Sequence, residues 1–180
     1  MLNIAYLAGL IDGEGCISIF RHKNDGCRED HYSYRPLVQV AMVYKPLIKM
    51  LHVQYGGQYA DKKPGDETRR NYAQWSLRGG RCVDLLRQLE PLLICKKEEA
   101  RHVIAFWDDK SVRLSGGNMK AIHGAEREAL KAKREWYRLH LQALKKYNFG
   151  PLWDAGEVGG SPMPGLVYGF DVKHIQGAEG

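Results

Sequence analysis

The sequence predicts an α+β fold in which a four-stranded antiparallel sheet is backed by helices on one face. Four short segments alternate apolar and polar side chains, as half-buried strands do. Helical periodicity separates and follows them, in the order helix, strand, strand, helix, strand, strand, helix, helix. This order covers one face of the sheet with helices and leaves the other face open.

The first helix is predicted over residues 4–12, with Asn3 as its N-cap and with Gly13 and Gly15 ending it through their tolerance for positive φ. Strand alternation begins at Cys16 and runs to His22. A polar loop over 23–32 leads to a second strand at 35–43. Both strands direct one apolar row toward the core.

A second helix is expected from Pro46 until Gly56-Gly57, since proline suits a first turn and glycine a C-terminus. Strands are predicted at 58–62 and 70–77, joined by a turn. Helices at 81–89 and 97–107 complete a domain spanning residues 1–112.

The rest of the chain divides into two expected segments. Residues 113–149 are expected to form a basic helical extension, with the helix over about 120–147, and the glycine- and proline-rich residues 150–180 an irregular tail. Two interpretations of the helix stay open. It docks on the core with solvated charges, or it lies on nucleic-acid phosphates.

Length and composition bound the class of protein. With 180 residues, 44% hydrophobic and 27% charged, the chain has the size of one folded domain and is too apolar to be disordered. Its 27 Lys and Arg against 21 Asp and Glu give a formal charge of +6, which favours polyanionic partners. The longest apolar stretch is about half of what spans a bilayer, and it lacks the features of a secretory signal. We expect a cytoplasmic protein, not secreted and without a membrane partner.

The chemistry concentrates at the end of the first helix. Ala5, Gly9 and Gly13 are spaced by four residues, so one helix face has almost no side chains and admits close approach of another helix. Asp12 and Glu14 follow beside glycines. A carboxylate at the negative end of a helix dipole is unfavourable, which indicates that a cation compensates it.

The stretch from Leu7 to Gly15 resembles the LAGLIDADG motif of the homing endonucleases. Seven of its nine positions agree, and it differs at Gly13 and Glu14. The resemblance covers roughly residues 3–108, and residues 90–100 resemble a second recognisable stretch of the family. It implies the family's αββαββα saddle, with the four-stranded antiparallel sheet facing DNA. The segment after residue 110 lies outside the resemblance and is expected as a C-terminal helical extension, which occurs in such proteins.

The resemblance also implies roles for individual residues. The acid at the eighth position of the motif, here Glu14, binds the catalytic divalent cation in this family, assisted by the Gly13 carbonyl. Mg²⁺ is the expected cofactor, Mn²⁺ is expected to substitute, and no small-molecule cofactor is expected. Lys96 is the lysine that arranges solvent and charge near the scissile phosphate. A polar residue that the family places near the end of the second strand is not matched, because Met42 and Val43 lie there.

Single-motif proteins of this family act as homodimers. The resemblance therefore implies a dimer interface of Ala5, Ala8, Gly9 and Asp12, and cleavage that leaves 5′ phosphates and cohesive 3′ hydroxyl ends. It also extends the expected location to the compartment of the host genome, an organelle included.

Double-stranded DNA is the expected partner, with a β-surface reading base edges while basic side chains meet phosphates. The expected DNA contacts are Ser18, Phe20, His22, Asn24, Arg35, Gln39, Gln58, Lys62, Lys63, Arg69, Arg70, Tyr72 and Gln74.

Two other functions stay open beside the site-specific endonuclease. One is a DNA-binding regulator that keeps the fold without cleavage. The other is an intron RNA maturase, to which the basic helix at 120–147 would contribute a further surface.

Overall fold

The computed structural model describes residues 1–23, 32–63, 70–112 and 124–147. Residues 1–149 form one compact unit. Its elements are α1 (Ile4–Glu14), β1 (Gly15–Lys23), β2 (Tyr32–Met42), α2 (Lys45–Tyr55), β3 (Gln58–Lys62), β4 (Tyr72–Arg78), α3 (Gly80–Leu89), the short 3-10 helix η1 (Glu90–Leu92), α4 (Lys97–Asp108) and α5 (Gly124–Tyr147). The predicted α+β class and order of elements are confirmed.

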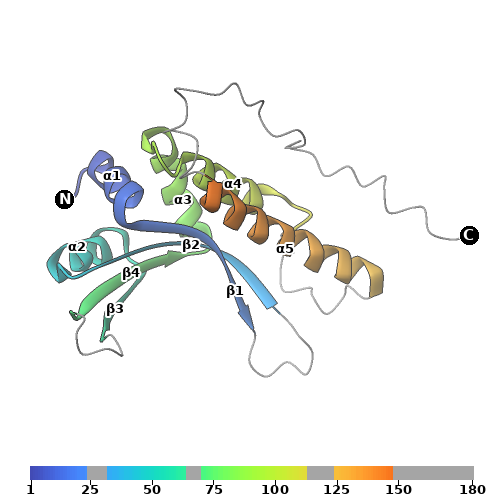
Figure 1. The fold of residues 1–180 in the computed structure, drawn as a ribbon, viewed down its shortest axis with the longest axis horizontal. Helices are drawn as coiled ribbons and strands as arrows, with labels where there is room; N and C mark the ends of the chain where they lie inside the picture. The colour runs from blue at the N-terminus through green and yellow to red at the C-terminus, as the bar shows by residue number, and fades with distance from the viewer. Residues whose placement is uncertain (24–31, 64–69, 113–123, 148–180) are drawn as a thin grey trace, which may run out of the picture. The chain divides into compact units, whose positions relative to one another are not determined.

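The four strands form one antiparallel sheet in the order β1-β2-β4-β3. Ile17 pairs with Val38, and Val40 pairs with Trp75; all four side chains are fully buried. Helices α1, α3, α4 and α5 lie on this buried side, and the opposite face stays open (Figure 1). The predicted division between a covered and an open face is confirmed for the described strands.

Helix α1 begins as predicted but ends later. The Asn3 side chain accepts a hydrogen bond from the Ala5 backbone N–H at 2.9 Å, which caps the helix. Gly13 is still helical, and Gly15 is extended at φ −81°, so the expected positive φ was wrong. Gly15 is required for another reason, because a Cβ there would stand 2.7 Å from the Ile11 carbonyl oxygen. A close turn from α1 into β1, and not a left-handed residue, explains this glycine.

The end of α2 follows the prediction. Gly56 adopts φ +68° and Gly57 φ +86°, which L side chains rarely adopt. The Trp75 indole N–H donates to the Gly56 carbonyl at 2.6 Å, tying this turn to β4. The double glycine therefore both ends α2 and positions the polar edge of the core tryptophan.

Helix α5 packs on the rest of the unit. Leu130 and Leu141 are buried, and a ring nitrogen of His102 on α4 lies 2.8 Å from the Tyr137 carbonyl oxygen. Glu135 accepts a hydrogen bond from the Tyr34 hydroxyl at 2.8 Å. The expected boundary between residues 112 and 113 borders residues 113–123, which lie outside the described residues. The expected tail at 150–180 also lies outside them.

Candidate active site and nucleic-acid interface

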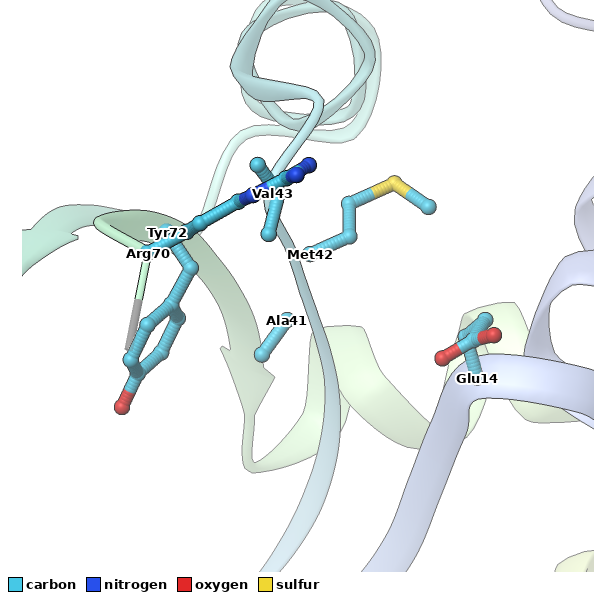
Figure 2. Close-up of a pocket in the computed structure, with 6 residues that line it drawn as sticks. All are labelled: Glu14, Ala41, Met42, Val43, Arg70 and Tyr72. Carbon is cyan, nitrogen blue, oxygen red and sulfur yellow. The ribbon is translucent and has the colours of Figure 1, made fainter. Parts of the chain in front are cut away.

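Glu14 is the last residue of α1, where the helix turns into β1. It lines an exposed groove whose other wall comes from the end of β2 and the segment that enters β4 (Figure 2). The groove residues are Glu14, Ala41, Met42, Val43, Arg70 and Tyr72. Among the residues that the structure describes, none forms a hydrogen bond or ion pair with Glu14. The groove thus holds an unpaired carboxylate and a guanidinium, both exposed.

Lys96 and Asp12 join the loop before α4 to the end of α1. The Lys96 ammonium donates to the carbonyl oxygens of Ile11 and Asp12 at 2.8 and 2.7 Å. In return, the Asp12 carboxylate accepts the backbone N–H groups of Ile94 and Lys96 at 2.7 and 2.9 Å. Lys96 therefore satisfies carbonyl groups at the end of α1, and Asp12 satisfies N–H groups before α4. These bonds fix the helix end that carries Glu14.

This arrangement identifies the cation that compensates the α1 dipole. Carbonyl groups at a helix C-terminus carry partial negative charge, and a lysine there is stabilising. The ammonium that meets them is Lys96, from the same chain. The unfavourable helix end is thus resolved within the chain, and Glu14 is left for another partner.

The small-residue face of α1 is open. Ala5, Gly9 and Gly13 are exposed, and a Cβ built on either glycine would meet no atom within 4 Å. Ala8, which we expected on this face, is 1% exposed and lies in the core, because it falls on the side of the helix that packs on the sheet. Asp12 is only partly exposed, and its carboxylate is used by the loop before α4.

Among the described residues, the donor chemistry fits a hydrated Mg²⁺ and not a closed metal cage. Mg²⁺ keeps several waters and is commonly held by one or two carboxylates together with substrate phosphates. Glu14 offers one exposed carboxylate, and the Gly13 backbone beside it is uncovered. In the described ranges no three His, Cys, Asp or Glu side chains gather as a metal site. Further ligands would come from outside these described residues, for example from a substrate phosphate or a second copy.

The pairing register places the predicted sheet contacts on one face. Gln39 lies opposite Ser76, and Gln74 lies opposite Ala60, at positions that alternate with the buried Val38, Val40 and Trp75. The residues that share this open face are Ser18, Phe20, His22, Arg35, Gln39, Gln58, Lys62, Tyr72 and Gln74. Lys63 and Arg70 are exposed just outside the strands, while Asn24 and Arg69 lie outside the described residues.

Arg78 is a basic residue of this face that sequence reasoning missed. It pairs with Leu37 at the end of β4, and its guanidinium lies 5.0 Å from the centre of the Phe20 ring. The predicted strand ended one residue too early, at Leu77. Continuing the alternation of Tyr72, Gln74 and Ser76 by one step would have found it.

The basic residues of α5 are mostly held by the chain itself. Arg134 donates to the Val112 carbonyl at 2.8 Å, and Lys133 pairs with Asp109 at 2.9 Å. The acids Glu128, Glu135 and Glu99 pair with Lys131, Arg138 and Lys145. This helix lies on the helical side of the sheet, away from the open face (Figure 1). The structure therefore favours the docked interpretation of α5.

No protein-family model matches the chain, and no curated protein matches it in sequence. Several solved structures match the chain in fold. The homing endonuclease I-CvuI, in complex with a DNA target in the presence of Mg with the DNA not cleaved, matches with a TM-score of 0.56 and 17% identity, over 86% of this chain and 95% of that one.

Two further solved structures have the same arrangement. The LAGLIDADG homing endonuclease I-GzeII, in complex with its DNA target, matches with a TM-score of 0.53 and 14% identity, over 77% of this chain and 44% of its own. An archaeal intron-encoded homing endonuclease complexed with DNA matches with a TM-score of 0.50 and 13% identity, over 82% of this chain and 97% of its own. At these identities the likeness establishes the fold, so the chain has the fold of the LAGLIDADG homing endonucleases.

Within the described part of the chain, no helix is both long enough and apolar enough to cross a membrane.

Proposed function

We propose that this chain is a site-specific double-strand DNA endonuclease of the homing type. The observation that carries the proposal is Glu14, an exposed carboxylate without a partner among the described residues, held at the end of a capped helix and sharing a groove with Arg70. The fold is shared with homing endonucleases whose structures contain DNA. We further propose Mg²⁺ as the cofactor, with Mn²⁺ able to replace it.

The residues of the groove divide the work. Glu14 and the Gly13 carbonyl would hold the divalent cation beside the scissile phosphate. Such an ion supplies Lewis-acid stabilisation of phosphate charge and lowers the pKa of an attacking water. Lys96 neutralises the carbonyls of α1 and fixes the helix end that carries Glu14. Arg70 is exposed on the same groove and would meet a phosphate.

The open sheet face would bind the DNA. A curved β-surface fits the major groove, where polar side chains distinguish base pairs. Glutamines, His22, Arg35 and Arg78 supply donors and acceptors of that kind. Lys62 and Lys63 stand at the end of β3, where phosphate contacts would set orientation.

A second copy would complete the enzyme. One chain offers one Glu14, whereas double-strand cleavage needs a reacting centre for each strand. The exposed stripe of Ala5, Gly9 and Gly13 lies immediately before that residue, so pairing two α1 helices there would bring two Glu14 carboxylates together. The homodimer is part of this proposal, and Ala8 is no longer part of its interface.

The test is cleavage of a plasmid library that carries the uninterrupted host locus and randomised inserts, with Mg²⁺ or with EDTA. The parent should linearise a defined target with 3′ overhangs only when the metal is present. Glu14→Gln should cut on the order of 10²-fold more slowly, because several kcal/mol of charge stabilisation is lost.

Glu128→Gln is the matched control, since it makes the same chemical change at an exposed surface position on α5. Equal cleavage by Glu14→Gln and the parent would contradict the metal role. Tight duplex binding without cleavage in either Mg²⁺ or Mn²⁺ would instead establish the non-cleaving regulator. The maturase interpretation loses its main support, because most of the described cations of α5 are paired within the chain.

A further inference from the structure

Glu99 is a buried acid that the proposed reaction does not use. It lies in the first turn of α4, is 3% exposed, and its Oε2 atom has no hydrogen-bond partner among the described residues. A buried carboxylate in this condition is costly unless it is protonated or a cation stands nearby. Glu99 therefore attracts any positive charge within reach.

Two lysines are within reach of Glu99. The Lys145 ammonium of α5 lies 3.7 Å from Glu99 Oε2 and also 3.2 Å from the Cys16 thiol of β1. Lys96 is the N-cap of α4, three residues before Glu99, and its positive charge acts on the Glu99 carboxylate. Burial raises the pKa of Glu99, the charges of Lys145 and Lys96 oppose that rise, and Asp12 on α1 adds to it.

The Lys96 ammonium is hydrogen-bonded to α1, while its charge also acts on Glu99. It donates to the carbonyls of Ile11 and Asp12 at 2.8 and 2.7 Å. A move toward Glu99 would uncover the last turn of α1, which ends in Glu14.

We propose that Lys145 is a positioning residue that satisfies the charge of Glu99 and thereby keeps Lys96 on the end of α1. Helix α5 would in this way control the proposed active site through Glu99 of α4 and Lys96. The proposal rests on the proposed function only in that Lys96 matters for cleavage. The competition between Glu99 and the end of α1 for the Lys96 ammonium does not depend on DNA.

Charge competition predicts an asymmetry between variants. Lys145→Met leaves Glu99 with Lys96 as its remaining cation, so Lys96 is drawn away and kcat should fall about tenfold with KM unchanged. Lys145→Arg should retain parental kcat. Glu99→Gln removes the charge that draws Lys96, so the double variant Glu99→Gln/Lys145→Met should recover to within about threefold of the parent.

Lys146→Met is the matched control, because Lys146 is exposed on the same turn of α5, and it should leave kcat unchanged. A double variant as slow as Lys145→Met would overturn the proposal, since loss of α5 packing would then explain the effect. Thermal unfolding of each variant reports whether it is folded.

A crystal structure of Lys145→Met without DNA tests the same competition independently of cleavage. We expect the Lys96 ammonium to have left the Ile11 and Asp12 carbonyls for Glu99. If it stays on α1, the proposal is wrong, whatever the enzyme does. If it moves but the parent cuts no DNA, the positioning holds and the proposed nuclease function fails.

Discussion

The end of α1 and the surface of α5 are both charged, but their charges are used differently. Glu14 is exposed on a groove without a partner in the described chain, and the helix face before it is bare. Along α5, the cations Lys131, Lys133, Arg138 and Lys145 are paired with acids of the same chain. The carboxylate at the end of α1 therefore lacks a partner in the described chain, whereas most of the described cations of α5 have one.

The difference shows that a count of charges is a poor guide to function. The basic helix suggested a nucleic-acid surface, yet Lys133 and Lys145 pair with acids at the end of α4 and within it, and Lys131 and Arg138 pair with acids of α5 itself. A single carboxylate carries more information because nothing in the described chain explains it. Four experiments test this contrast, in order of decreasing expected effect.

The largest effect is expected from filling the bare face of α1. Gly9→Leu should weaken dimerisation on the order of 100-fold or more and abolish cleavage, because the side chain blocks close helix approach in both copies. The isolated chain should unfold at an unchanged Tm, since a Cβ at Gly9 meets no atom within 4 Å. Sedimentation equilibrium measures the change. Ala129→Leu, exposed on α5, should leave the dimer intact, and a Gly9→Leu dimer of parental affinity would show that α1 is not the interface.

Removing the ammonium at the end of α1 comes next. Lys96→Met loses two hydrogen bonds of a charged donor, each worth about 1.5–3 kcal/mol, so kcat should fall about 100-fold with some loss of stability. Lys133→Met on α5 also breaks a pair, with Asp109, but should change only the free energy of unfolding. Single-turnover cleavage and urea unfolding separate these outcomes. Equal kcat losses in the two variants would erase the contrast between the regions.

A smaller effect is expected on DNA affinity. Arg78→Ala on the open sheet face should weaken binding about 3–10-fold and reduce the slope of log K against log salt by about 1, because one cation of the DNA-binding face is lost. Arg138→Ala should leave both unchanged, because its guanidinium is held by Glu135 on the helical side. Fluorescence anisotropy over a salt series measures this. A larger salt effect from Arg138→Ala would return α5 to the nucleic-acid interface.

The smallest expected effect is a dependence of the free energy of unfolding on pH, caused by Glu135 on α5. Hydrogen bonds from Arg138 and Tyr34 lower the pKa of Glu135 from 4.5 to about 2. Because the folded pKa lies below the unfolded one, this stability is present above pH 4.5 and is lost as the pH falls toward 2. Urea unfolding should show a loss of about 1–2 kcal/mol over that window. Glu135→Gln should flatten it, Glu128→Gln should not, and an unchanged slope in Glu135→Gln would remove Glu135 from this account.

Local patterns in the sequence predicted most of the fold. Alternation in β1 and β2 placed Ile17 and Val38 in the core and Ser18 and Gln39 on the open face, because side-chain direction in a strand depends only on parity. The motif at the end of α1 pointed to Glu14 in the same way. Errors arose where three-dimensional packing decides: Gly15 serves a close approach, Ala8 is buried, and β4 extends to Arg78.

Local periodicity and residue type were enough to predict the elements and the two faces of the sheet, and they pointed to Glu14 as the candidate metal ligand. Only the tertiary structure decided which charges are partners. Lys96 meets α1 across more than eighty residues, and Lys145 meets Glu99 across more than forty. Such pairings follow from packing between distant segments, which no local pattern encodes. The same packing leaves Glu14 exposed on the groove and pairs basic residues of α5 with acids of the same chain.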